Sequence, residues 1–263
     1  MKYKLLGFVC CPVCKGPLAL EVFVEKDEVE EGRLTCEGCT RIFPVINGMP
    51  RLLPDELANM VLRFHAPFFD RYAGPMSSYL RRCQTQPQDG WWRAQRRTLT
   101  SFSYQWRKFK EMIPHWEQVF LDSISPIEAG FFRGKVGLDA GCGFGRSLYY
   151  AASYGAEVIG MDLSEAVEAA RENTRHLPNV HLIQADIFNP PLRERSLDFV
   201  YSIGVLHHLP DPKQGFLALS HLLTHGAPIF IWVTSRGRGR QIALFTLMRS
   251  LSTRLPLRLL DFL

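Results

Sequence analysis

The segment that most constrains the fold is residues 137–146, GLDAGCGFGR, in which one acid precedes three closely spaced glycines. Asp139 is followed by Gly141, Gly143 and Gly145 at every second position. The apolar run KVGLDAG predicts a buried strand, and RSLYYAASYG after the loop predicts a helix with one apolar face. A strand, a glycine loop and a helix in this order are typical of the first unit of a parallel α/β sheet.

The same alternation continues along the chain and predicts a Rossmann-like α/β domain over residues 135–235. Four further strands are predicted from AEVIGMDLS, NVHLIQADI, SLDFVYSIGVLHHL and APIFIWVT, with helices at EAVEAARENTRHL and KQGFLALSHLL. In such sheets a ligand binds beyond the carboxyl ends of the strands, where the strand order reverses. We therefore expect Gly141, Gly143 and Gly145 to form the ligand-binding loop.

The acids of this domain decide between two kinds of ligand. A dinucleotide loop has the pattern GxGxxG and holds a pyrophosphate, which the carboxylate of Asp139 would repel. S-adenosylmethionine (SAM) has no phosphate and carries an ammonium and a sulfonium, which that carboxylate favours. Asp162, 23 positions later at the second strand end, can accept the ribose hydroxyl protons. Asp186, at the third strand end, can accept from the adenine amino group while Ile187 packs on the ring, so we predict SAM as the cofactor.

The motifs LDAGCGFGR and VLHHLPDP resemble those of the class I SAM-dependent methyltransferases over residues 136–233. The resemblance implies that the cofactor contacts include Asp139, Gly141, Gly143, Asp162 and Asp186. A full domain of this family adds two antiparallel strands after the fifth strand, and the 30 residues after Val233 have no strand pattern. We expect a sheet without its last two strands, in a chain that is truncated or divergent there. The alternative is a Rossmann-like domain that binds another nucleotide.

Four of the seven cysteines form two CxxC pairs, Cys11 with Cys14 and Cys36 with Cys39, separated by 21 residues. This spacing predicts a Cys₄ zinc ribbon, with hairpin strands at LALEVF and EGRLTC. A closed Cys₄ site has no open position for a substrate, so the predicted zinc is structural and supplies folding energy to a small module. The alternative is four unrelated thiols, and Cys10 is left as a spare.

The string CPVCKGPLAL … LTCEGCTRIFPVINGMPRLLP, within residues 6–54, resembles the small zinc-ribbon proteins that activate tRNA and protein methyltransferases. It also resembles the same module fused in front of bacterial methyltransferases. In the stand-alone family the module binds and stabilises a methyltransferase partner. The resemblance implies that such a partner is present here in the same chain.

The segment after the fourth strand, SIGVLHHLPD, usually faces the methyl group in the methyltransferases that this chain resembles. It lacks the Asn/Asp-Pro-Pro-aromatic motif of adenine and glutamine N-methyltransferases and the nucleophilic cysteine of cytosine C5 enzymes. We predict that His207 or His208 is a general base, because imidazole accepts protons near neutral pH. The alternative is that one histidine packs under the following helix, which Asp211 caps.

Two stretches are strongly basic. Residues 81–110 carry eight Lys/Arg against one acid, with six aromatic residues interleaved, a composition that suits RNA binding. Within that stretch, SFSYQWRKF resembles a lid segment found ahead of the methyltransferase domain in the fused proteins, and we predict a lid. Residues 236–263 are basic and amphipathic, and we predict that they cover the pocket. Peripheral contact with a membrane or a lipid-like acceptor is the alternative for this tail.

The sequence predicts four parts: a zinc ribbon at 1–58, a helical connector or lid at 59–134, a SAM-binding domain at 135–235 and the tail at 236–263. No apolar run reaches the roughly 18 residues of a membrane span. The apolar run in residues 5–9 is shorter than the roughly 7 to 15 residues of a signal peptide. A cytoplasmic location is therefore predicted.

The predicted function is that of a SAM-dependent methyltransferase acting on a small-molecule or lipid-like acceptor. One alternative is an rRNA or tRNA methyltransferase, because a zinc module ahead of this domain resembles the rRNA guanine-N1 methyltransferases. Their fourth metal ligand is a histidine, where this chain has Cys39. The other alternative is a non-catalytic partner protein that activates a separate enzyme.

Overall fold

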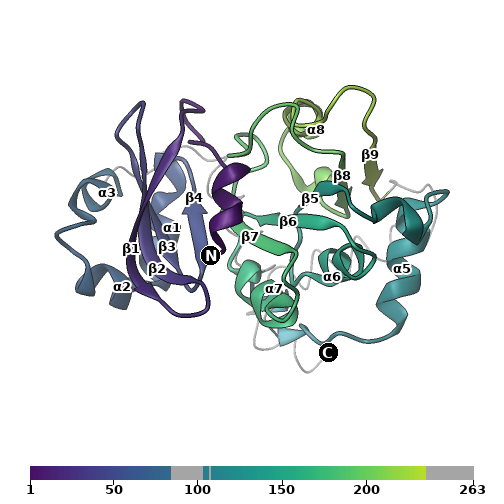
Figure 1. Ribbon diagram of the computed structural model, residues 1–263, viewed down its shortest axis with the longest axis horizontal. Helices are drawn as coiled ribbons and strands as arrows, with labels where there is room; N and C mark the ends of the chain where they lie inside the picture. Colours follow the sequence, from purple (N-terminus) through teal and green to yellow (C-terminus); the bar gives the residue numbers. More distant parts are fainter. Residues whose placement is uncertain (84–102, 107, 235–263) are drawn as a thin grey trace, which may run out of the picture. The chain divides into compact units, whose positions relative to one another are not determined.

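The computed structural model describes residues 1–83, 103–106 and 108–234 (Figure 1). The chain divides into two compact units, Met1–Trp232 and Val233–Leu263, and nearly all of the second lies outside the described residues. The predicted tail at 236–263, with its covering or membrane-binding role, also lies outside them, as does most of the basic stretch at 81–110.

Nine strands form one sheet in the order β1-β2-β3-β4-β7-β6-β5-β8-β9. Their bounds are β1 Leu18–Glu25, β2 Val29–Cys36, β3 Ile42–Ile46, β4 Met49–Leu52, β5 Val136–Ala140, β6 Glu157–Asp162, β7 Val180–Ala185, β8 Phe199–Ile203 and β9 Ile229–Trp232. The five strands from β5 onward pair only in parallel, with β5 and β8 adjacent where the order reverses. This arrangement confirms the predicted Rossmann-like α/β fold, and within the described residues the sheet ends at β9.

The first four strands form an antiparallel ribbon, of which the sequence pattern predicted the hairpin of β1 and β2. The last of them, β4, then pairs in parallel with β7, with Arg51 opposite Gln184 and Leu52 opposite Ala185. The ribbon therefore continues the parallel sheet, and β4 covers the edge of β7 that would otherwise present unpaired backbone groups.

The bounds of the helices are α1 Ala58–Phe64, α2 Ala66–Arg71, α3 Ser77–Arg82, α5 His115–Ile124, α6 Arg146–Ser153, α7 Ala166–Thr174 and α8 Pro212–Ser220. Helices α5, α6 and α7 cover one face of the parallel strands and α8 the other, while α1, α2 and α3 lie beside the ribbon (Figure 1). Side chains of α5, α6 and α7 share one buried apolar cluster with Val158 and Phe199. Leu219 of α8 belongs to the cluster that contains Leu138 and Ile159 instead. Consecutive residues 158 and 159 point to opposite faces because side chains alternate along a strand.

The ribbon contributes to two apolar cores: Ile46 packs with residues of α1–α3, while other ribbon residues pack with the parallel sheet. Leu34 and Phe43 of the ribbon are fully buried in the same cluster as Leu138, Ile183 and Val200 of the parallel sheet. Burying such side chains contributes about 1.5 to 3 kcal/mol each relative to leaving them exposed. The apolar packing of the small module therefore depends in part on the larger domain.

Candidate functional site

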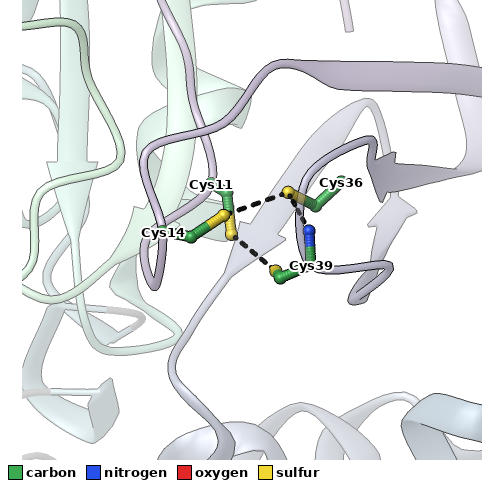
Figure 2. Close-up of side chains that lie close together, drawn as sticks. All are labelled: Cys11, Cys14, Cys36 and Cys39. Atoms are coloured by element: carbon green, nitrogen blue, oxygen red, sulfur yellow. Dashed lines mark hydrogen bonds between the residues drawn. The ribbon is translucent and has the colours of Figure 1, made fainter.

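The four cysteines of the two CxxC pairs converge on one point of the ribbon (Figure 2). Their sulfur atoms all lie within 4.8 Å of one another. The Sγ atoms of Cys11 and Cys39 are 3.6 Å apart, and those of Cys14 and Cys36 are 3.4 Å apart. A tetrahedral zinc site with Zn–S bonds of about 2.3 Å places its sulfurs about 3.8 Å apart. The donor set and its spacing fit a structural Zn²⁺.

The first cysteine knuckle packs against the loop that follows β7. Lys15 Nζ donates to the carbonyl of Pro190 at 2.7 Å, and the amide of Cys10 donates to the carbonyl of Pro191 at 2.9 Å. This loop begins with Asp186, so the predicted metal site supports the segment that carries one of the three predicted cofactor acids.

A pocket of about 1020 Å³, its open mouth included, lies beside the glycine loop. Six of the seven predicted cofactor residues line it: Asp139, Gly141, Gly143, Asp162, Asp186 and Ile187. Their positions follow from the topology, because parallel strands end at the same edge of the sheet.

Each glycine of the loop has a positive φ, and two of them also allow close packing. At Gly141, φ is +88°, and an added Cβ would lie 2.4 Å from a Val205 methyl group. Gly145 does not line the pocket. An added Cβ there would lie 3.1 Å from Ala170 of α7, so the absence of a side chain at Gly145 permits close helix packing.

Asp139 is the most unusual of the three acids. It is 2% exposed, and its Oδ2 has no hydrogen-bond partner among the described residues. Burial raises the pKa of Asp139 to about 8; the nearby Tyr201 hydroxyl opposes the shift and the charge of Asp162 adds to it. A buried carboxyl with one oxygen left without a hydrogen-bond partner at a pocket wall is suited to receive a cation.

The other two acids are already oriented by backbone amides. Asp162 Oδ2 accepts from Gly143 N at 2.9 Å, and its Oδ1 accepts from Ser164 N at 2.8 Å and Ser164 Oγ at 2.7 Å. Asp186 Oδ1 accepts from Phe188 N at 3.0 Å. Burial raises the pKa of both carboxyls, and these amide bonds oppose the shift. Both acids keep lone pairs for a ligand.

The two predicted histidines differ in their relation to the pocket. Both lie on the 3₁₀ turn Leu206–His208, with ring centroids 4.0 Å apart, but only His208 lines the pocket. Asp211 caps α8, as one alternative predicted: its Oδ1 accepts from Gln214 N at 2.9 Å.

Two family models match the chain. Residues 138–231 match the family described as "Methyltransferase domain", and residues 2–48 match the family described as "Trm112p-like protein". The chain combines a Trm112p-like domain with a methyltransferase domain. Both resemblances inferred from the motifs are confirmed.

The methyltransferase domain also has curated relatives. A tRNA (carboxymethyluridine(34)-5-O)-methyltransferase of Saccharomyces cerevisiae is 29% identical over 52% of this chain and 51% of its own length. A demethylmenaquinone methyltransferase of Staphylococcus haemolyticus is 33% identical, over 39% of this chain and 45% of its own. A ubiquinone biosynthesis O-methyltransferase of Cupriavidus pinatubonensis is 29% identical, over 49% and 57%. The chain thus spans about half the length of these relatives.

Similar solved structures include a SAM-dependent methyltransferase from Aquifex aeolicus, with a TM-score of 0.43 and 21% identity, covering 52% of this chain and 77% of that one. Another is a chain of a Haloferax volcanii complex that contains the Trm112 methyltransferase activator, with a TM-score of 0.39 and 24% identity, covering 44% and 51%. Among the described residues of the present chain, no helix has the length and apolar character to cross a bilayer. The cytoplasmic location stays a prediction.

Two further residues line the pocket: Arg146, which was missed by the sequence reasoning, and Trp106, which lies in the segment SFSYQWRKF that was predicted to be a lid. Arg146 begins α6, and its guanidinium lies 4.6 Å from the centre of the Trp116 ring. Burial lowers the pKa of Arg146, and the charge of Asp139 opposes this shift. Trp106 lines the pocket from the helical turn at 103–106. The only sequence signal for a role of Arg146 was its position directly after Gly145, the last glycine of the loop.

A second buried polar cluster joins the Trm112p-like domain to the methyltransferase domain. Arg51 of β4 is 0% exposed; it donates to Gln184 Oε1 at 3.1 Å, is paired with Glu168 and lies 3.7 Å from Glu165. His65 Nε2 lies 3.1 Å from Glu165. The side chains of His65, Glu165 and Glu168 lie close enough together to ligate a metal. The Arg51 guanidinium offsets one of the two carboxylate charges, and this cluster links β4 to the segment that begins α7 through buried ion pairs.

Proposed function

We propose that this chain is a SAM-dependent methyltransferase whose Trm112p-like domain stabilises the catalytic domain of the same chain. The observation that carries the proposal is the convergence of three acids from three strand ends on one pocket beside the glycine loop. The methyltransferase family match supports the same conclusion.

The pocket residues fit the groups of SAM one by one. Asp139 would hold the ammonium, which supplies the cation that its buried oxygen lacks, and Arg146 would hold the carboxylate. Asp162 would accept from the ribose hydroxyls, and Asp186 from the adenine amino group, with Ile187 against the ring. When bound, SAM supplies an electrophilic methyl group on a sulfonium.

Methyl transfer asks little covalent chemistry of the protein, which must align the acceptor and remove its proton where it has one. We assign proton removal to His208, because it lines the pocket beside Ile203, Val205 and Leu209. An imidazole among apolar side chains suits a hydroxyl on a small-molecule or lipid-like acceptor. The ubiquinone and demethylmenaquinone methyltransferases among the relatives support this acceptor class.

A tRNA acceptor is the second candidate, and the relatives supply the observation that favours it. The Saccharomyces cerevisiae protein and a Psychromonas ingrahamii protein, 31% identical, both have names that specify tRNA. A carboxymethyl acceptor would already be ionised at neutral pH, because carboxyl pKa values lie near 4. Such an acceptor needs no general base, so the two candidates differ in whether His208 matters.

The fused zinc domain supports stabilisation within the chain. The four cysteines would hold a structural Zn²⁺, and the first of their two knuckles contacts the loop after β7. A non-catalytic protein that activates a separate enzyme would have no need of a pocket with an unpartnered carboxylate. That alternative is tested by cofactor binding itself.

The experiment is a calorimetric titration with SAM and with S-adenosylhomocysteine, followed by methyl-label transfer from SAM to tRNA, lipid and small-molecule fractions. The proposal expects binding by the wild-type chain, loss of SAM binding in Asp139→Asn, and label in one acceptor fraction. Absence of any heat of binding from the zinc-loaded wild type would refute it. Label in tRNA that is unaffected by His208→Ala would replace the small-molecule acceptor with the second candidate.

A further inference from the structure

A tryptophan from outside the sheet packs over the glycine loop. It belongs to residues 103–106 and 108–110, which we call the roof segment. Trp106 lines the cofactor pocket, and its ring centroid lies 5.2 Å from that of Phe144. A Cβ added to Gly143 would lie 3.5 Å from Trp106 Nε1. The indole therefore lies directly against the loop, on the side to which a side chain at position 143 would project.

One amide side chain connects this roof segment to the loop below it. Asn173, in the last turn of α7, donates from Nδ2 to the carbonyl of Lys110 at 2.9 Å and to the carbonyl of Phe144 at 2.9 Å. Lys110 ends the roof segment, and Phe144 belongs to the glycine loop. An amide NH₂ group has two donors, so a single side chain satisfies both carbonyls.

The roof segment has a second attachment at its other end. Ser103 is 7% exposed, and its Oγ accepts from the amide of Glu165, the residue just before α7. Lys110 also forms an ion pair with Glu172 of α7. Helix α7 therefore holds both ends of the roof segment, while Asn173 alone among these contacts also holds the glycine loop.

We propose that Asn173 is a positioning residue that sets the distance between Trp106 and the glycine loop, and thereby the affinity for the aminoacyl end of the cofactor. The inference rests on the proposed function, because it assumes that the pocket binds SAM. Asn173 does not line the pocket, so it would act on the ligand only through Trp106 and the glycine loop. Loss of its two bonds frees the Phe144 carbonyl and the Lys110 carbonyl together, so the roof and the loop separate.

The test compares two asparagines with the same bonding pattern. Asn179 Nδ2 donates to the carbonyls of Ala152 at 2.8 Å and Ala156 at 2.6 Å, and it lines no part of the cofactor pocket. Asn173→Asp and Asn179→Asp each replace two donors with an acceptor of the same shape. We expect Asn173→Asp to weaken S-adenosylhomocysteine binding about tenfold. Asn179→Asp should lower the melting temperature but leave that affinity within about twofold.

Two further measurements separate positioning from general stability. The ligand-induced change in tryptophan fluorescence should be lost in Trp106→Ala and reduced in Asn173→Asp at saturating ligand. In a double-mutant cycle, Asn173→Asp should cost little further affinity once Trp106 is already Ala, because its effect acts through the roof. Asn173→Ala serves the same comparisons if the aspartate variant does not fold.

Equal affinities for the wild type and both Asn173 variants would overturn the inference, as would fully additive losses in the cycle. Those results would leave the proposed function intact. Failure of the wild type to bind S-adenosylhomocysteine at all would instead remove the proposed function, and the inference with it.

Discussion

Replacing Asp139 with Asn should stabilise the empty protein and abolish SAM binding. The carboxyl is 2% exposed, its Oδ2 has no partner among the described residues, and its pKa is raised to about 8. The folded protein therefore holds the proton on Asp139 more tightly than the unfolded chain does. Asparagine has a similar shape and carries no charge, so it removes this effect while also removing the negative charge that the ammonium needs.

The magnitude follows from linkage. Between the ordinary pKa of 3.8 and the folded value of about 8, the native state binds more protons, so the free energy of unfolding falls as pH rises. At pH 7 the cost has accumulated over about three pH units, or about 4 kcal/mol. If Asp139→Asn regains about half or more of this free energy of unfolding, its melting temperature should rise by roughly 5 to 10 °C. Near pH 4 the two proteins should melt together.

The assay is thermal unfolding of the ligand-free proteins between pH 4 and 8, with Asp198→Asn as the matched control. Asp198 Oδ2 accepts from the Val136 amide at 2.9 Å, and asparagine can accept the same bond only without a charge, so this replacement should not raise the melting temperature. At pH 7 the Asp139 carboxyl of the ligand-free wild type is mostly protonated, and it must ionise to pair with the SAM ammonium. Binding should therefore release about 0.9 proton, which calorimetry in different buffers would detect as a buffer-dependent heat. An Asp139→Asn protein that melts no higher than the wild type at pH 7 would refute the reasoning.

Three further predictions concern the base, the metal and the domain junction. With a hydroxyl acceptor, His208→Ala should lower kcat about 100-fold, whereas His207→Ala should change kcat only a few-fold, as steady-state kinetics would show. Cys36→Ser should lower the zinc content measured by atomic absorption and weaken S-adenosylhomocysteine binding, since the knuckle supports the loop after β7. Arg51→Met should destabilise the protein by about 3 to 5 kcal/mol in urea unfolding, because it leaves Glu165 and Glu168 without their buried partner.

The parts of the fold that could be predicted from the sequence are those with local signals. Alternating strands and helices predicted the parallel sheet, and the spacing of the cysteines predicted that four thiols meet. The three acids could be placed together because each ends a strand of one parallel sheet. The sequence pattern did not show the packing role of Gly145, because the approach of helix α7 to the loop is a contact between distant segments.

The features that were missed depend on contacts between distant segments. The pairing of β4 with β7 joins residues 133 positions apart, and a four-residue strand carries too short a pattern to predict its partner. Asn173 looks like an ordinary polar residue near a helix end, and its role appears only when Lys110 and Phe144 are brought together. The sequence did not show which of His207 and His208 faces the pocket. That depends on the 3₁₀ turn Leu206–His208, which directs adjacent side chains to different sides.

The β4–β7 pairing gives a physical reason for the fusion of the two domains. All six residues of β7 are buried, and this strand leads directly into Asp186. Without β4, the backbone groups along one edge of β7 would lose their partners, and Glu165 would lose its pairing with Arg51. Glu165 is also the residue whose amide holds Ser103 at the start of the roof segment. A change at the ribbon edge would therefore reach the loop of Asp186 through β7 and the roof segment through Glu165, so the ribbon completes the structure around the pocket.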